Sequence, residues 1–271
     1  MFFLQKLLRF LDAEMPQPQP YGIFHLVCFA LSILAGVLLC ITHKRGNPDW
    51  VRKTVLITSV IVALLEVYKQ INFSFSYEGG ISFDYQWYAF PFQFCSTPMY
   101  IGLLAGFTKK GRLHNAANAY LATFSMFAGI CVMFYPTTVF IDTIGINIQT
   151  MVCHGSMITL GIYLLYSGYV KREHKTILRA IPVFITCVLL AMLLNEIAYR
   201  TGLLENDTFD MFYISPYCTP SLPLFSLIQP HVPFLVSVLI YVSAFSLASY
   251  LILLAAMGIA RVAEKKAKVT V

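Results

Sequence analysis

Seven long apolar stretches constrain this chain more than any other feature of its sequence. Each is about 20 residues or longer, the length of helix that crosses a hydrocarbon core about 30 Å thick. They lie at residues 22–42, 54–73, 88–107, 113–134, 149–169, 176–199 and 232–260. Charged residues make up only 12% of the chain, too few to coat a soluble globule of 271 residues. We therefore predict an all-α polytopic membrane protein with seven transmembrane helices in a single domain, 1–271.

The basic residues predict the orientation of these helices, because short cytoplasmic loops carry an excess of Lys and Arg. Alternate loops and the tail 261–271 hold 15 of the 19 basic residues: Lys44, Arg45, Arg52, Lys53, Lys109, Lys110, Arg112, Lys171, Arg172, Lys175, Arg179, Arg261, Lys265, Lys266 and Lys268. The opposite loops hold acidic residues instead: Glu78, Asp84, Asp142, Glu205, Asp207 and Asp210. We expect the amino terminus outside and the carboxyl terminus in the cytoplasm. The plasma membrane is the expected location, with the endoplasmic reticulum as the alternative.

Two segments outside the predicted spans have features of their own. Residues 1–21 place their apolar side chains on one helical face and end in a PQPQP turn, which predicts a short interfacial helix. The outer loop 200–231 is Pro-rich and apolar enough to fold back over the bundle as a lid, and a plain ordered loop is the alternative.

Polar residues at membrane depth gather near the outer side of the predicted bundle. An ionisable group at the bilayer centre costs at least about 2.5–3.5 kcal/mol, so such groups usually face the bundle interior or a wet cavity. At about 1.5 Å per residue, polar groups from four helices fall roughly 6–10 Å below the outer helix ends. The residues concerned are Glu66, Lys69, Gln93, Cys95, Ser96, His154, Asn195 and Glu196. This layer predicts a cavity open to the outer leaflet.

Cys95 and His154 are the candidate catalytic residues of this layer. A thiol nucleophile needs a neighbour that takes its proton or stabilises its thiolate, and histidine is the commonest one. A buried apolar thiol and an imidazole in an interhelical hydrogen bond are the structural alternatives. The candidate accessory residues are Gln93, Ser96 and Asn195 as oxyanion donors, Glu66 or Glu196 as the group that orients His154, and Lys69 as the partner of Glu66.

Metal and nucleic-acid binding are disfavoured by the same sequence. A metal site of Cys95, Cys153, His154 and His231 is awkward, because Cys153 and His154 are adjacent and point about 100° apart on a helix. No CxxC pair is present. The basic residues form short clusters between apolar runs and not a face with interleaved aromatic residues. We expect no metal, no cofactor and no nucleic-acid partner.

The segment FPFQFCSTPMY, followed some sixty residues later by MVCHGSM, resembles the YwaF-type integral membrane proteins over roughly residues 20–255. That family is similar to an animal transmembrane acyltransferase of ether phospholipids, and more distantly to androgen-induced hydrolases of fatty-acid esters. The resemblance implies that Cys95 receives an acyl group as a thioester and that His154 assists. The chain departs from the family pattern at Gln93, where many members have His, and at Ser96, where many have an acidic or amide residue.

We expect a lipid acyltransferase, transacylase or lipid-ester hydrolase that acts on a membrane phospholipid or another fatty-acyl lipid. The alternative is a non-enzymatic transporter or small-solute binder that uses the same outward cavity, with Glu66, Lys69 and Glu196 as its functional charges. The oligomeric state stays open.

Overall fold

The computed structural model describes residues 2–42, 47–77, 79–136, 139–202 and 209–269, with the side chains of residues 2 and 267–269 left out. Some residues that predicted the orientation therefore lie outside the described part: Lys44, Arg45, Glu78, Glu205, Asp207 and the side chain of Lys268.

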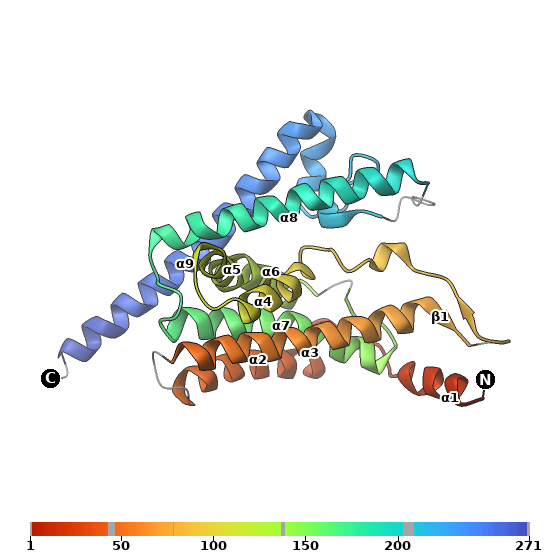
Figure 1. Ribbon diagram of the computed structural model, residues 1–271, viewed down its shortest axis with the longest axis horizontal. Helices are drawn as coiled ribbons and strands as arrows, with labels where there is room; N and C mark the ends of the chain where they lie inside the picture. Colours follow the sequence, from red (N-terminus) through yellow and green to blue (C-terminus); the bar gives the residue numbers. More distant parts are fainter. Residues whose placement is uncertain (1, 43–46, 78, 137–138, 203–208, 270–271) are drawn as a thin grey trace.

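Helices account for almost all of the regular structure (Figure 1). The α-helices are α1 Phe2–Leu11, α2 Ile23–Thr42, α3 Pro48–Ser74, α4 Thr97–Phe107, α5 Arg112–Tyr120, α6 Met126–Phe134, α7 Ile144–Tyr166, α8 His174–Arg200 and α9 Phe234–Val269. The π-helical turn η2 Leu121–Ser125 joins α5 to α6, and short 3₁₀ helices lie at η1 Trp87–Ala89, η3 Met211–Tyr213, η4 Phe225–Leu227 and η5 Gln229–His231. Strands β1 Phe75–Ser76 and β2 Ser82–Phe83 form an antiparallel hairpin.

Six helices in the described residues are long and apolar enough to cross a membrane. They are α2, α3, the continuous 112–134 helix, α7, α8 and α9. The prediction of one continuous helix over 88–107 is wrong, because α4 has only 11 residues and spans about 16 Å. Pro91 and Pro98 explain the difference, since proline lacks a backbone N–H and disfavours the helical conformation of the residue before it. The segment 84–96, which we call the irregular segment, and α4 together lead from the hairpin towards the start of α5 (Figure 1).

Helix α7 is the centre of the bundle. It has 15 buried residues among its 23, whereas α2 has three among 20 and presents most of its surface outward. Glycines let the neighbours approach α7 closely, as is typical of helices in membranes. A Cβ on Gly155 would meet Ser32 of α2 at 2.2 Å, and one on Gly161 would meet Met126 of α6 at 2.6 Å.

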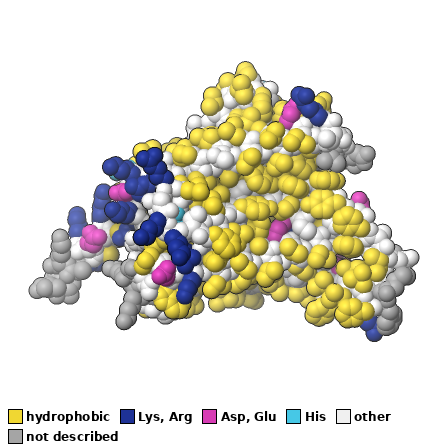
Figure 2. Space-filling view, in the orientation of Figure 1, with side chains coloured by type: hydrophobic (Ala, Val, Ile, Leu, Met, Phe, Trp, Pro, Cys, Tyr) yellow, Lys and Arg dark blue, Asp and Glu magenta, His cyan; other side chains and the backbone are white. Residues whose placement is uncertain are grey.

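Lys and Arg side chains gather at one end of the molecule, which we call the basic end (Figure 2). It carries the described basic residues of 52–53, 109–112, 171–179 and 261–266. The opposite end, called the far end, carries α1, the β hairpin and the loop 209–231 (Figure 1). The predicted segregation of basic residues to one end is therefore present in the fold.

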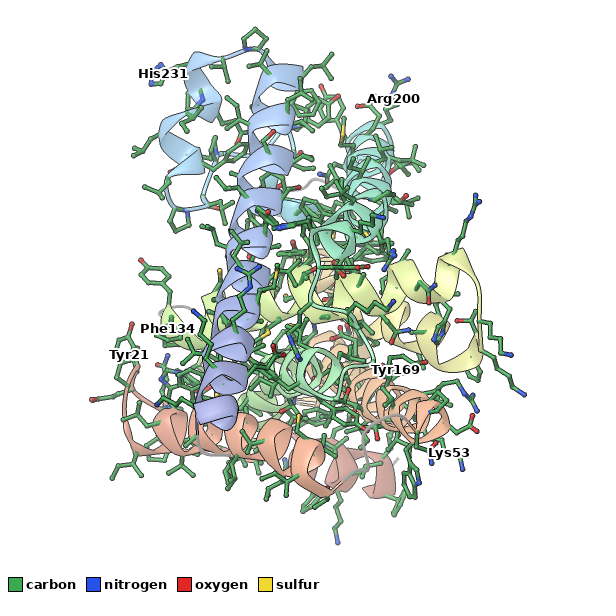
Figure 3. All side chains as sticks on the ribbon, turned by 90° about the vertical axis from the view of Figure 1, so that its left-hand side faces the viewer. Tyr21, Lys53, Phe134, Tyr169, Arg200 and His231 are labelled. Carbon is green, nitrogen blue, oxygen red and sulfur yellow. The ribbon has the colours of Figure 1, made fainter. Side chains whose placement is uncertain are left out.

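The far end is closed by segments that lie outside the long helices. Asp12, just after α1, accepts hydrogen bonds from Asn72 and Tyr77, which ties α1 to the end of α3. The Tyr21 hydroxyl donates to the carbonyl of Phe134 at 2.7 Å (Figure 3). Phe3 and Phe10 of α1 are 80% and 77% exposed, as expected for a helix whose apolar face meets lipid headgroups.

Candidate functional site

Cys95 lies in the irregular segment, immediately before α4. The backbone N–H groups of Ser96 and Thr97 both donate to the carbonyl of Gln93, which forms a tight turn around Cys95. Helix α4 begins at Thr97, two residues later. The positive end of a helix dipole stabilises a nearby thiolate. The break in the predicted third span thus places Cys95 at a helix amino terminus.

The Cys95 thiol is half-buried and lies among apolar groups. It packs against a buried cluster formed by Val62, Met99, Ala128, Cys153 and Met157. The Sγ of Cys153 lies 3.9 Å from the carbonyl oxygen of Cys95, so this segment contacts α7 directly. The Ser96 side chain and the backbone N–H of Cys95 are both close enough to interact with the thiol.

Glu66 and Lys69 form the predicted ion pair on α3. The Nζ of Lys69 lies 2.8 Å from Oε1 of Glu66, and both side chains are mostly buried. Gln70 donates to Oε1 of Glu66 at 2.8 Å, and Gln149 of α7 donates to Oε2 at 3.5 Å. Gln70 also donates to the carbonyl of Ala89 at 2.7 Å, so the network joins α3, α7 and η1.

The ion pair is the charged centre of the candidate site. The charges of Glu66 and Lys69 act on the Cys95 thiol and also on that of Cys153. The Lys69 charge acts on the imidazole of His154 as well. The predicted cysteine and histidine therefore share one charged neighbour.

His154 is buried on α7 with one ring nitrogen unpaired. Its Nδ1 lies 2.8 Å from the carbonyl oxygen of Thr150, a distance at which the nitrogen donates. The tautomer assigned by this bond leaves Nε2 without a proton. Within the described residues Nε2 is buried and has no hydrogen-bond partner. A buried acceptor left unpaired costs about 1–3 kcal/mol, so Nε2 of His154 is free to accept a hydrogen bond from a group that reaches it.

No hydrogen bond joins Cys95 to His154 within the part of the chain that the structure describes. The neighbour of His154 on α7, Cys153, makes the contact with the Cys95 segment instead. The shared charge of Lys69 connects the two candidates at longer range.

Two predicted oxyanion donors hold the outer loop in place. Gln93 donates to the carbonyl of Asp210 at 2.8 Å and accepts from the N–H of Phe212 at 2.9 Å. Asn195 donates to the carbonyl of Met211 at 3.1 Å and accepts from its N–H at 2.8 Å. Both side-chain amides therefore hold residues 210–212 by hydrogen bonds. The sequence did not predict this role, because the partners are more than fifteen residues away along the chain.

Glu196 does not orient His154. Its carboxylate accepts hydrogen bonds from Arg200 at 2.6 Å and from Tyr217 at 2.5 Å. The Tyr217 ring stacks on Tyr199, with ring centroids 3.7 Å apart. The role predicted for Glu196 is wrong because its side chain lies on the partly exposed face of α8, beside the outer loop.

The described part of the outer loop packs into the core. Met211, Phe212 and Ile214 are almost fully buried, and Phe212 lies beside Phe94 with ring centroids 5.8 Å apart. Phe94 directly precedes Cys95, so the loop closes the far end over the candidate site. The lid interpretation of 200–231 stays a prediction.

Burial of Asp210 predicts a pH dependence of stability. Burial raises its pKa from 3.8 to about 6, and the N–H groups of Ser215 and Ile214 partly oppose the shift. Because the folded pKa lies above the unfolded one, stability falls as pH rises from about 4 to about 6, by about 2–3 kcal/mol. We expect Asp210→Asn to remove this part of the pH dependence, measured as the difference in Tm between pH 4 and pH 7. Asp84→Asn, at an exposed carboxylate, is the control, and equal pH slopes in all three proteins would contradict the assignment.

An apolar groove of about 430 Å³ opens beside the ion pair. Helix α3, the β hairpin, α4 and the segment between them form its walls, with Phe83, Tyr85, Pro91 and Leu103 among the lining residues. Glu66 lies at its edge, and Met99 both lines the groove and packs in the cluster around Cys95. The sequence predicted a cavity at this polar layer, but it did not predict apolar walls or the part that the hairpin plays, because the hairpin side chains reach α3 only in the tertiary structure.

Six apolar helices around a cysteine, a histidine and a buried ion pair define a multi-pass integral membrane protein with a polar intramembrane site. The chain belongs to the TMEM164 family, whose model matches residues 20–250. No curated protein and no solved structure gives a significant match.

Proposed function

We propose that this protein is an intramembrane lipid acyltransferase, transacylase or lipid-ester hydrolase that works through a thioester on Cys95. The observation that carries the proposal is the position of the thiol. Cys95 lies at the amino terminus of α4, beside a buried ion pair and next to a groove that is apolar and open. The resemblance of the two motifs to the YwaF-type proteins, a family similar to a membrane acyltransferase of ether phospholipids, supports the same chemistry.

The proposed reaction has two steps. In the first, the Cys95 sulfur attacks the ester carbonyl of a phospholipid, the thiol proton passes to Nε2 of His154, and the C–O bond breaks as the leaving alcohol takes that proton. In the second, a hydroxyl of another lipid or a water molecule attacks the thioester and gives its proton to Nε2 of His154, the C–S bond breaks, and the leaving thiolate takes that proton to restore the thiol. We assign stabilisation of the oxyanion to the backbone N–H of Cys95 and the Ser96 hydroxyl, which both lie close to the thiol.

The groove suits a fatty-acyl chain. Its lining is almost entirely apolar, and Met99 both lines it and packs in the cluster around Cys95, so a fatty-acyl chain in the groove would lie close to that cluster. We expect Leu103→Trp to narrow this path and to lower turnover of long-chain lipids by about tenfold or more relative to short-chain ones. Turnover of lipids of graded chain length measures the effect. Leu189→Trp, on the exposed surface of α8, is the control, and unchanged chain preference in the Leu103 variant would rule out this path.

The orientation that we propose for the chain decides to which leaflet the site opens. We infer that the basic end faces the cytoplasm, that the segment 88–107 completes a seventh crossing, and that the site opens to the outer leaflet of the plasma membrane or to the lumenal leaflet of the endoplasmic reticulum. Epitope tags at the two termini, stained in intact and permeabilised cells, test this topology.

The alternative of a transporter or small-solute binder gives the functional role to Glu66, Lys69 and Glu196. The contacts of these side chains argue for the enzyme, because Glu66 is already matched by Lys69, Gln70 and Gln149, and Glu196 by Arg200 and Tyr217. A binding charge is more effective when it has no partner in the protein.

Trapping the thioester tests the proposal directly. Purified protein is incubated with a phospholipid that carries a labelled acyl chain, and the label is located by mass spectrometry of peptides with and without hydroxylamine. We expect hydroxylamine-labile label on Cys95 in the wild type and in Cys153→Ala. Label on other cysteines alone, or none in protein that is folded and supplied with lipid, would refute the mechanism.

A further inference from the structure

A second cavity of about 440 Å³ lies at the basic end, far from the candidate site along the bundle. Three parts of the chain form it: the α4–α5 connection, the first turns of α5, and the connection from α7 into α8. Its lining residues include Lys109, Lys110, His114, Asn118, Lys171 and Arg179. A volume of this size is typical of small-ligand sites, which range over about 300–1,000 Å³.

The floor of this cavity is polar and pre-organised. His114 and Asn118 are buried, although both lie in an otherwise apolar bundle. His114 Nε2 lies 2.7 Å from the Tyr169 hydroxyl, Nδ1 lies 3.2 Å from the Thr108 hydroxyl, and Asn118 donates to the His114 carbonyl at 2.8 Å. Figure 3, which looks onto the basic end, shows Tyr169 among the helix ends, with Lys53 at the edge. Burial of polar side chains in an apolar bundle is costly, so we expect His114 and Asn118 to have a role other than solubility.

The charge at the cavity rim is unbalanced. Arg179 pairs with Glu173 at 3.2 Å, whereas Lys109, Lys110 and Lys171 are in none of the ion pairs formed by described residues. The preference of basic residues for cytoplasmic loops explains why these lysines lie at this end. It does not explain why lysines from the α4–α5 connection and from the α7–α8 connection line the same cavity, whose floor is polar.

The start of α5 adds further donors to the same cavity. Gly111 caps this helix with a φ of +107°, a conformation that side chains disfavour, and among the described residues no side-chain hydrogen bond caps the helix. Gly111 also lines the cavity. Uncapped N–H groups at a helix amino terminus bind phosphate and similar anions.

We propose that this cavity binds the phosphate group of a phosphate ester. The lysines neutralise its charge, the amino terminus of α5 donates to its oxygens, and the His114 and Asn118 floor contacts the group that the phosphate carries. A phospholipid headgroup and a soluble phosphate compound share this chemistry, and the site is independent of the acyl chemistry at Cys95.

Binding to the full-length chain in lipid nanodiscs tests the proposal. Inorganic pyrophosphate is titrated into phosphatidylcholine nanodiscs, and phosphatidic acid is incorporated into a parallel set. The increase in Tm with ligand gives an apparent Kd. Binding of pyrophosphate supports a soluble ligand, and stabilisation by phosphatidic acid alone supports a lipid headgroup.

The matched variants are Lys110→Gln/Lys171→Gln, at the cavity, and Lys175→Gln/Lys265→Gln, at the same end but outside its lining. Both pairs remove two charges. We expect the cavity pair to weaken binding by about tenfold or more, because charge-assisted hydrogen bonds are lost, and the outer pair to change it by less than about threefold. All four lysines are exposed, so the Tm without ligand should stay unchanged. Equal weakening by both pairs, or no stabilisation of the wild type by either probe, would overturn the proposal.

Discussion

Replacing Cys95 with alanine is expected to abolish acyl transfer, with turnover at least about 1,000-fold below that of the wild type. The reason is that both proposed steps pass through a thioester on the Cys95 sulfur. Release of a labelled fatty acid or lysophospholipid by purified protein measures the effect. Cys153→Ala is the matched control, because that thiol contacts the same segment 3.9 Å from the Cys95 carbonyl but has no assigned chemical role.

His154→Gln separates the two halves of this mechanism. Removal of a general base lowers turnover by about 10²–10⁴-fold, so the variant should fall between the wild type and Cys95→Ala. It should still fold, because glutamine can donate to the Thr150 carbonyl as His154 does. Full activity in a folded Cys95→Ala protein would eliminate the thioester, and full activity in His154→Gln would leave Cys95 in place but assign the base elsewhere.

Neutralising Glu66 is expected to cause the largest loss of stability among the charge substitutions. Glu66→Gln keeps a polar group of the same size but leaves the Lys69 ammonium without its counter-charge, where only 17% of that side chain is exposed. Breaking a buried ion pair in this way costs about 3–5 kcal/mol. Unfolding in detergent with increasing denaturant measures the change in the free energy of unfolding.

Two further variants test whether burial of the Glu66–Lys69 ion pair causes the expected loss of stability. Glu196→Gln breaks an exposed pair with Arg200 and should change stability little. Adding Lys69→Met to Glu66→Gln removes the stranded charge and should recover much of the loss, giving a large coupling between the two sites. A double variant no more stable than Glu66→Gln would show that the hydrogen bonds to Gln70 and Gln149, and not the charge of Lys69, stabilise this region.

The sequence predicted the long helices well because each depends on its own residues. The predicted spans 22–42 and 176–199 correspond closely to α2 and α8, since hydropathy and local breakers decide whether a segment forms an apolar helix. The pairing of Glu66 with Lys69 was also predictable, because residues three apart lie on one helical face.

The contacts between elements could not be predicted in the same way. Pro91 and Pro98 were noted as sources of irregular geometry, but hydropathy alone favoured a full helix over 88–107, and the loss of its first half moved Cys95 to a helix amino terminus. Gln93 and Asn195 were assigned to catalysis by residue type and depth. Their actual partners, at 210–212, belong to a loop whose path is decided by the packing of Phe212 into the core.

The sequence by itself determined the class of the protein, the apolar helices, the separation of basic from acidic loops and the choice of Cys95 and His154 as candidates. These follow from hydropathy, charge and residue chemistry, which act locally along the chain. Only the tertiary structure decided that α7 is central, that the charge of Lys69 acts on both candidates, and that an apolar groove and a basic cavity lie at different places in the bundle. The reason is that each depends on how helices rotate and pack against one another, and small residues such as Gly155 and Gly161 set that packing through contacts far apart in sequence.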